Sequence, residues 1–179
     1  MADAGYAATT MRAVADAAEV SVKTVEAAFG TKANLLKELI DVAIAGDDEP
    51  VAIADREVIA EMIAEPDPHR LLELNARFIA DVSRRLAAVD RALSEAAAGD
   101  PGLEDLLQTS LDNRVEGARQ FIEVLATRTP LRLDVDEAID TAWLLLDPHH
   151  YRVVTAHRGW SHERYVAWLT DAQIRLLLP

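Results

Sequence analysis

The sequence contains no cysteine. It therefore forms no disulfide, holds no zinc ribbon and has no thiol nucleophile. It also has no run of eighteen apolar residues, so we expect no membrane span. Residues 1–10 lack the basic start and the apolar core of a signal peptide. Together these absences predict a soluble cytoplasmic protein that does not bind a membrane.

Aromatic residues are scarce at 5%, although 50% of the 179 residues are hydrophobic. Alanine and leucine are abundant, and no stretch alternates apolar and polar residues for long enough to build a sheet. These features predict an all-α protein whose core is made of packed helices. The length suits either one compact domain or a small head joined to a larger body.

Basic residues are few, and the net charge of −13 argues against non-specific binding to nucleic acid. Residues 1–45 hold four basic and six acidic side chains, a net charge of −2, and contain all three lysines. Residues 46–179 hold 14 arginines and 25 acidic side chains, a net charge of −11. The first segment can therefore contact DNA through a few placed cations and helix ends, with modest affinity per copy.

The most informative segment, residues 5–32, is typical of two short helices joined by a tight turn, with a third helix beginning at Thr31. The turn is expected at Glu19-Val20, and the small Ala15 allows the two helices to cross closely. Side-chain oxygens can cap the three helices, from Thr9 or Thr10, from Ser21 and from Thr31. The second helix should bury Val25, Ala28 and Phe29 and expose Val22, Lys23, Glu26 and Ala27.

This pattern is a helix-turn-helix of the kind that places its second helix in the DNA major groove. The segment resembles the DNA-binding head of the tetracycline-repressor (TetR) family of bacterial transcriptional regulators. The residues that carry the resemblance are Gly5-Tyr6, Thr9-Thr10, Val14-Ala15, Ala18, Val20-Ser21, Thr24-Val25, Phe29, Thr31-Lys32 and Leu35-Leu36. The segment from Trp160 to Tyr165 also resembles the start of the last helix in this family.

The chain departs from the family at two informative places. A full helix precedes Gly5 in the family, whereas only Met1 to Ala4 stand there in this sequence, so we expect a head truncated at its N-terminus. Glu19 stands in the turn where the family usually has glycine, a position that favours a positive φ. A positive φ at a non-glycine residue costs about 1 kcal/mol, so we expect strain at Glu19. From the resemblance we expect DNA contacts from Thr10, Ser21, Lys23, Thr24 and Lys32. Lys23 is the expected base contact and the others are expected to contact phosphates.

The sequence Gly46-Asp47-Asp48-Glu49-Pro50 ends the third helix and separates a head, residues 1–45, from a body, residues 46–179. Apolar residues spaced by three and four predict further helices in the body. They are expected over 55–64, from Leu71 to Leu93, from Leu103 to Leu125, from Val135 to Leu146 with Asp134 or Asp136 as cap, and from Ser161 to Leu177. Tyr151 to Ala156 should form a turn or a short helix.

The body resembles the family in size and helical character, which implies a helical bundle that binds a small-molecule effector and forms a homodimer. The last helix carries apolar residues on more than one stripe, as expected for a helix that also contacts a partner subunit. The expected interface residues are Trp143, Trp168, Leu169 and Leu176. The expected effector contacts are Asn75, Phe78, Arg85, Phe121, Trp143 and Tyr151.

No sequence pattern in the chain predicts catalysis. The sequence has no glycine-rich phosphate loop, nucleophile elbow or HExxH sequence. The four histidines of the C-terminal part, His149, His150, His157 and His162, do not have the spacing of metal ligands. We therefore expect no catalytic residue, no metal site and no cofactor.

The sequence favours a ligand-responsive repressor that binds a palindromic DNA operator as a homodimer. The alternative is a helical small-molecule-binding or dimerisation protein that no longer binds DNA, because its head lacks the first helix. A third hypothesis is an all-α enzyme that uses the same pocket.

Overall fold

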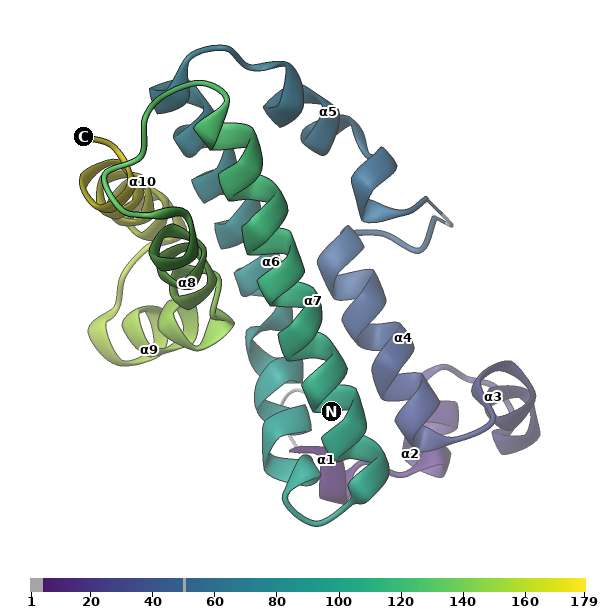
Figure 1. Ribbon diagram of the computed structural model, residues 1–179. Coiled ribbons are helices and arrows are strands. Elements are labelled where there is room, and N and C mark those ends of the chain that lie inside the picture. Colours follow the sequence, from purple (N-terminus) through teal and green to yellow (C-terminus); the bar gives the residue numbers. More distant parts are fainter. Residues whose placement is uncertain (1–4, 50) are drawn as a thin grey trace.

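The computed structural model describes residues 5–49 and 51–179, which are helical with no strand (Figure 1). The prediction of an all-α protein is therefore confirmed. Within the same range, no helix is long and apolar enough to cross a membrane. The elements are α1 (Gly5–Ala8), α2 (Met11–Ala17), α3 (Val22–Phe29), α4 (Lys32–Ala45), a 3-10 turn η1 (Ile53–Asp55), α5 (Glu57–Ala64), α6 (Pro68–Ala97), α7 (Pro101–Ala126), α8 (Val135–Leu145), α9 (Pro148–Arg158) and α10 (His162–Leu177).

Side-chain caps begin most of these helices where the sequence predicts. Thr10, Ser21, Thr31 and Ser161 each accept a hydrogen bond from the backbone N–H three residues later. Asp134 does the same at the start of α8 and accepts from the Glu137 N–H. These bonds satisfy N–H groups that have no partner inside the helix, so each cap fixes a boundary.

Three body helices share a second start signal, an aspartate followed by proline. Asp67, Asp100 and Asp147 cap α6, α7 and α9, and each carboxylate accepts from the N–H two residues later at 2.8–3.0 Å. The proline at the first helical position loses no hydrogen bond there, and its φ is already helical. This pairing explains the sharp breaks that separate the long helices.

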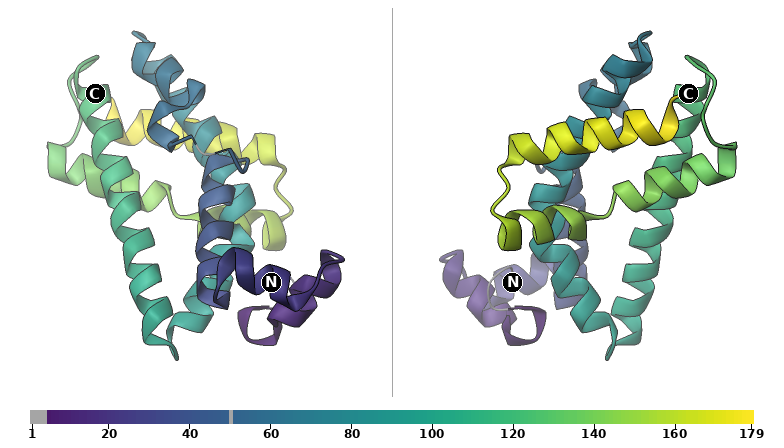
Figure 2. Two further views of the ribbon diagram at one scale, coloured as in Figure 1. Left: turned by 90° about the vertical axis from the view of Figure 1, so that its right-hand side faces the viewer. Right: turned by 90° about the vertical axis from the view of Figure 1, so that its left-hand side faces the viewer.

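The two longest helices, α6 and α7, run in opposite directions and form the centre of the molecule (Figure 1). The helix α4 runs beside them and carries α2 and α3 at its far end, while α8, α9 and α10 cover the other side (Figure 2). Leu36, Ile40 and Ala43 of α4 share a core cluster with Leu86 and other residues of α6 and α7. The head is thus attached to the body through a packed apolar contact as well as through the chain.

Two further clusters hold the other side together. One surrounds Leu72 and Ile122 and joins α5, α6, α7 and α8 with the end of α10. The other surrounds Tyr165 and Leu169 and joins the middle of α6 to α9 and α10. Leu36, Leu72, Ile122, Tyr165 and Leu169 are completely buried, as expected for residues that hold separate helices in one structure.

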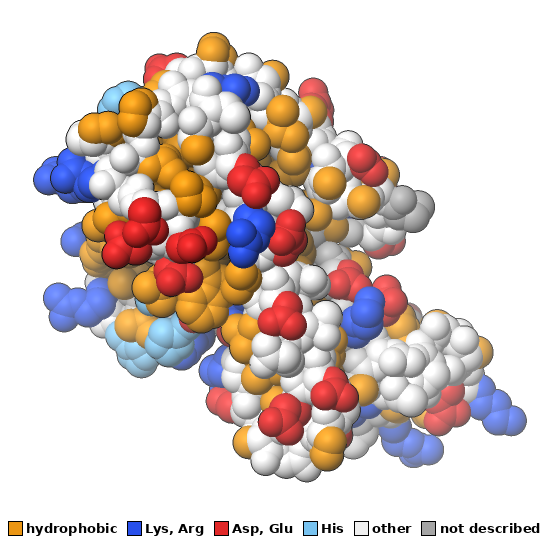
Figure 3. Space-filling view, in the orientation of Figure 1, with side chains coloured by type: hydrophobic (Ala, Val, Ile, Leu, Met, Phe, Trp, Pro, Cys, Tyr) orange, Lys and Arg blue, Asp and Glu red, His pale blue; other side chains and the backbone are white. Residues whose placement is uncertain are grey.

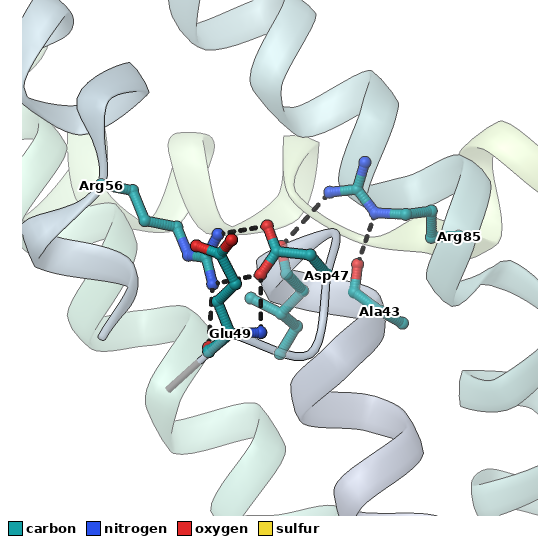
Figure 4. Close-up of polar contacts among 6 residues, drawn as sticks. Ala43, Asp47, Glu49, Arg56 and Arg85 are labelled. Carbon is teal, nitrogen blue, oxygen red and sulfur yellow. Dashed lines mark hydrogen bonds and ion pairs between the residues drawn. The ribbon is translucent and has the colours of Figure 1, made fainter. Parts of the chain in front are cut away.

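Arginine side chains secure the carboxyl ends of three helices from outside. Arg85 of α6 donates from Nε to the Ala43 carbonyl at 2.7 Å and from Nη2 to the Ile44 carbonyl at 3.2 Å, at the end of α4 (Figure 4). Arg128 donates to two carbonyls at the end of α5, those of residues 63 and 65. Arg132 donates from Nε to the Leu178 carbonyl after α10. A cation at these positions also suits the negative end of a helix dipole.

The structure corrects three local expectations. Ala28 is exposed and Phe29 is half-buried, because α3 packs mainly on α2 through the buried Val25. The helix α9 covers 11 residues rather than a turn, because Asp147-Pro148 starts it early and Gly159, with φ of 65°, ends it late. The short helix α1 was not expected, and the first four residues of the predicted truncated head lie outside the described range.

Candidate nucleic-acid interface

The candidate DNA-contacting surface of the head includes the first turn of α3 and the turn that precedes it. The Ser21 hydroxyl accepts from the Thr24 N–H at 3.1 Å and lies 2.8 Å from the Thr24 hydroxyl. Ser21, Lys23 and Thr24 are all exposed, whereas Val25 is buried. The helix therefore rests on Val25 and presents small polar groups and one long cation at its N-terminal end, which is the end that contacts base edges in helix-turn-helix proteins.

The turn between α2 and α3 is compact. Ala15 is completely buried at the crossing, and its carbonyl accepts from the Val20 N–H at 3.0 Å. Glu19 has φ of 55°, which is the conformation that the sequence predicts for a residue standing in place of glycine. The turn geometry is thus kept without glycine, at the cost of strain at one residue.

Lys32 differs from the other predicted DNA contacts because its side chain interacts with another residue of the protein, Tyr6. Its ammonium donates to the Tyr6 carbonyl and lies 3.8 Å from the centroid of the Tyr6 ring. Partial burial lowers the pKa of Lys32 below its ordinary value. Lys32 therefore connects α1 to α4. Thr10 is an exposed cap of α2, and its hydroxyl accepts from the Ala13 N–H at 3.1 Å.

The charge of this surface is mixed. Figure 3 shows basic side chains projecting at the lower right, where Figure 1 places α2 and α3, with acidic side chains beside them. Arg12 and Lys23 are exposed there, as are Asp16, Glu19 and Glu26. Such a surface cannot bind phosphate strongly by charge alone, so hydrogen bonds and shape have to contribute.

This arrangement, with two short helices, a tight turn and an exposed capped second helix, defines a helix-turn-helix head. Residues 1–39 match the family model for "Bacterial regulatory proteins, tetR family". The match covers the helix-turn-helix head and supports a DNA-binding transcriptional regulator. No curated protein and no solved structure matches the chain.

The residues predicted to contact an effector fall into three places. Phe78, Phe121 and Trp143 are partly buried and pack against the cluster around Leu72 and Ile122. Tyr151 lies in the cluster around Tyr165, where its hydroxyl is 3.3 Å from Nδ1 of His162. Arg85 is bound to the end of α4, away from both groups. Phe78 also packs against the cluster that contains Tyr151, so it connects the first group to Tyr151, whereas Arg85 lies apart.

Asn75 is buried, as its place on an apolar stripe predicts, and it has a polar partner. Its side-chain amide donates to the Gln173 carbonyl oxygen of α10 at 3.4 Å, and Gln173 is also buried. A separate surface groove of about 580 Å³ lies between α6 and α10. Its lining includes Glu73, Asp81 and Ile174, and none of the six predicted effector residues lines it.

The residues predicted to form a subunit interface differ in how far their side chains are exposed. Trp168 and Leu176 of α10 are 39% and 43% exposed, and Trp143 is half-buried. Leu169 is completely buried in the chain's own core, so it has no surface to offer a partner and we remove it from the proposed interface. Leu144 is 57% exposed and was not predicted as an interface residue. It belongs to α8, which lies on the same side of the molecule as α10 (Figure 2).

Proposed function

We propose that the chain is a ligand-responsive repressor that binds a near-palindromic DNA operator as a homodimer. The observation that carries the proposal is the capped α3, which exposes Ser21, Lys23 and Thr24 beside a correctly formed turn. Two such helices would enter successive major grooves, about 34 Å apart along the DNA. Residues 1–45 act as the DNA-binding head and residues 46–179 as the effector-binding and dimerisation body.

The proposed dimer forms through α8 and α10. Both helices lie on the face that Figure 2 (right) turns to the viewer. Each helix also has large apolar side chains that are exposed. These side chains are Leu144, Trp168 and Leu176. An effector acts by binding more tightly to a conformation in which the spacing of the two heads does not fit the operator. Its difference in affinity for the two conformations sets how much it weakens DNA binding.

Selection of bound DNA from a random pool at moderate salt tests the proposal. We expect an enriched near-palindromic site and an affinity that falls steeply as salt rises. Absence of any enriched sequence would contradict the proposal and favour a helical small-molecule-binding protein that does not bind DNA.

A matched pair of variants tests the assignment of α3 as the recognition helix. The double substitution K23A/T24A should weaken binding to the selected site by about tenfold or more, because it removes one base contact and one phosphate contact. The control K37A removes an exposed lysine of α4 that is paired with Asp41 and should have little effect. Equal losses in the two variants would show that α3 has no special role.

A further inference from the structure

The region of α8 and α10 contains all three tryptophans of the chain. Trp143 belongs to α8, Trp160 stands just before α10, and Trp168 belongs to α10. The rings of Trp160 and Trp168 meet edge to face with 6.0 Å between their centroids, and the Arg164 guanidinium lies 4.3 Å from the centroid of the Trp160 ring. Tryptophan and arginine are enriched among the residues that dominate the binding energy of protein interfaces. The start of α10 therefore has the residue types of a contact with another protein.

The exposed side of α8 is acidic. Asp136, Glu137 and Asp140 are exposed, and their spacing of three and four places them on one side of the helix with Leu144. We call these three acids the acidic stripe. Asp136 and Glu137 stand in the first turn, where an acid stabilises the helix dipole, but Asp140 lies beyond it. Among residues 5–49 and 51–179, no basic group forms an ion pair with any of the three carboxylates.

The exposed side of α10 is basic and aromatic. Arg164, Trp168 and Arg175 follow one another at intervals of four and seven residues and are all exposed, and we call them the basic stripe. No carboxylate in the described part of the chain pairs with Arg164. Nε of Arg175 lies 2.7 Å from the Asp171 carboxylate, but both side chains are exposed and such a pair contributes little to stability. Both arginines can therefore bind carboxylates of another chain.

Both stripes point away from the core of the body. Ala138 and Ala142 of α8 share with Leu177 of α10 the cluster around Leu72 and Ile122, whereas the stripes lie on the opposite sides of the two helices. The two helices run in opposite directions on one face of the molecule (Figure 2, right). Each copy of the chain thus presents one acidic and one basic stripe on the same face.

The charge of the whole molecule restricts how two copies can meet. Each copy has a net charge of −13, so two copies repel each other unless the surfaces in contact are complementary. The helix α8 holds three acidic residues and no basic one, a net charge of −3, whereas residues 148–177 hold four arginines and two acidic residues, a net charge of +2. Contact of α8 with α10 joins unlike charges, and a two-fold axis repeats that contact twice. Contact of α8 with α8, or of α10 with α10, joins like charges.

We propose that two copies of the chain recognise each other by charge, with the acidic stripe of each α8 against the basic stripe of α10 in the other copy. The inference rests on the proposed function, because it specifies how the two bodies of the proposed homodimer meet. Leu144 and Trp168 form the apolar part of the same contact, and the charges set its orientation.

Paired charge reversals test the proposal. The variant E137K/D140K makes both stripes basic, and R164E/R175E makes both stripes acidic. Each variant alone should dimerise at least about 100-fold more weakly than the original chain, because like charges then face each other. An equimolar mixture of the two should form a heterodimer about as tight as the original dimer, because both unlike contacts are restored. Sedimentation equilibrium of the full chains measures these affinities.

Two further variants separate charge recognition from damage to the fold. The four reversals combined in one chain exchange the two stripes and should restore the homodimer. The control D105K/E116K changes the net charge as much as E137K/D140K does, at exposed positions of α7, and should not weaken dimerisation. The proposal would be overturned by a mixture that stays monomeric, by a fourfold variant that does not dimerise, by equal weakening in the control, or by an original chain that is monomeric.

The selection of DNA separates this inference from the proposed function. A chain that dimerises and selects an operator, but whose two charge variants do not pair, would retain the proposed function and lose the inference. Variants that pair only with each other, from a chain that selects no DNA, would retain the charge recognition and lose the repressor.

Discussion

At the scale of single residues, Glu19 is the clearest case of backbone strain in the head. Its φ of 55° lies in the left-handed region, which an L-residue with a Cβ adopts at a cost of about 1 kcal/mol. The turn is nevertheless formed, because Ala15 and Val20 hold its two sides together by a backbone hydrogen bond. The strain is therefore balanced by contacts on either side of Glu19.

Replacing Glu19 with glycine should relieve this strain. We expect E19G to raise the free energy of unfolding by about 0.5 kcal/mol, because the gain in the folded turn exceeds the greater freedom of glycine in the unfolded chain. Urea unfolding measures the change. E19A is the control, since it removes the same side chain but keeps the Cβ, and it should give no gain. A lower stability of E19G than of E19A would refute the account.

Asp90 predicts a dependence of stability on pH. Burial is the main cause that raises its pKa above the ordinary value of 3.8, and the Arg114 guanidinium opposes that shift only in part. At pH values between 3.8 and the raised pKa, Asp90 of the folded chain keeps a proton that Asp90 of the unfolded chain releases. The free energy of unfolding contributed by Asp90 therefore falls as pH rises through this window.

The substitution D90N should remove this contribution. We expect the melting temperature of D90N, relative to the original chain, to increase from acidic to neutral pH. The control D112N changes an exposed aspartate of α7 that bonds only to Gln108 in the same helix, and it should give a flat difference. Parallel curves for D90N and the original chain would contradict the burial of a costly charge at this position.

At the scale of elements, the capped starts of the helices were predictable, whereas α1, the full length of α9 and the contacts between helices were not. Thr10, Ser21 and Thr31 cap the helices that follow them, because a cap acts within three residues and its signal is local in the sequence. Arg85 was expected to contact an effector but binds α4, and Arg128 and Arg132 were not singled out. Their partners are 42, 63 and 46 residues away, so no local pattern indicates them.

In the candidate site, too, features set by neighbouring residues were predictable, and contacts between distant residues were not. The exposure of Lys23 and Thr24 follows from the position of Val25 on the buried face of α3, which the sequence predicts. The internal role of Lys32 depends on Tyr6, which lies 26 residues away and contacts it only in the folded chain.

Arg85 provides a test at this scale. R85A removes two hydrogen bonds from a charged donor and leaves the carbonyls of Ala43 and Ile44 without them, so we expect a loss of about 1–2 kcal/mol in the free energy of unfolding. R84A is a matched control, because the neighbouring arginine is exposed and pairs with Asp81 at the surface. R85K should recover only part of the loss, since an ammonium lacks the planar fork. Equal effects of R85A and R84A would show that the contact with α4 adds no stability.

At the scale of the whole molecule, the exposed face of α8 and α10 is the feature that a monomer does not explain. Trp168 and Leu176 are eight residues, or about 2.2 turns, apart on α10 and are both exposed, and Leu144 is exposed on α8. Exposed apolar side chains gathered on one face are typical of a contact with another protein, whereas scattered ones are ordinary. An isologous pairing of this face would form a two-fold dimer that carries two heads.

Introducing a charge on this face should prevent the pairing. We expect W168E and L176E to be monomeric by light scattering at concentrations where the original chain is dimeric, because each buries a charge in the interface. V115E is the control, since Val115 is equally exposed but lies on α7. The monomers should also lose most of their affinity for the selected operator. A dimeric W168E/L176E double variant would exclude this face as the interface.

The Arg85 contact holds the carboxyl end of α4, Leu36 packs its amino-terminal half against the body core, and α3 lies beyond that amino-terminal end. The helix has 14 residues, so it is a lever about 21 Å long. A rotation of about 15° around the held end would carry Thr31 by about 5 Å, more than the 3.4 Å that separates successive base pairs. Because Leu36 and Ile40 pack α4 into the core of the body, such a rotation requires this core to repack, and a repacking there would put α3 out of register with the DNA sequence.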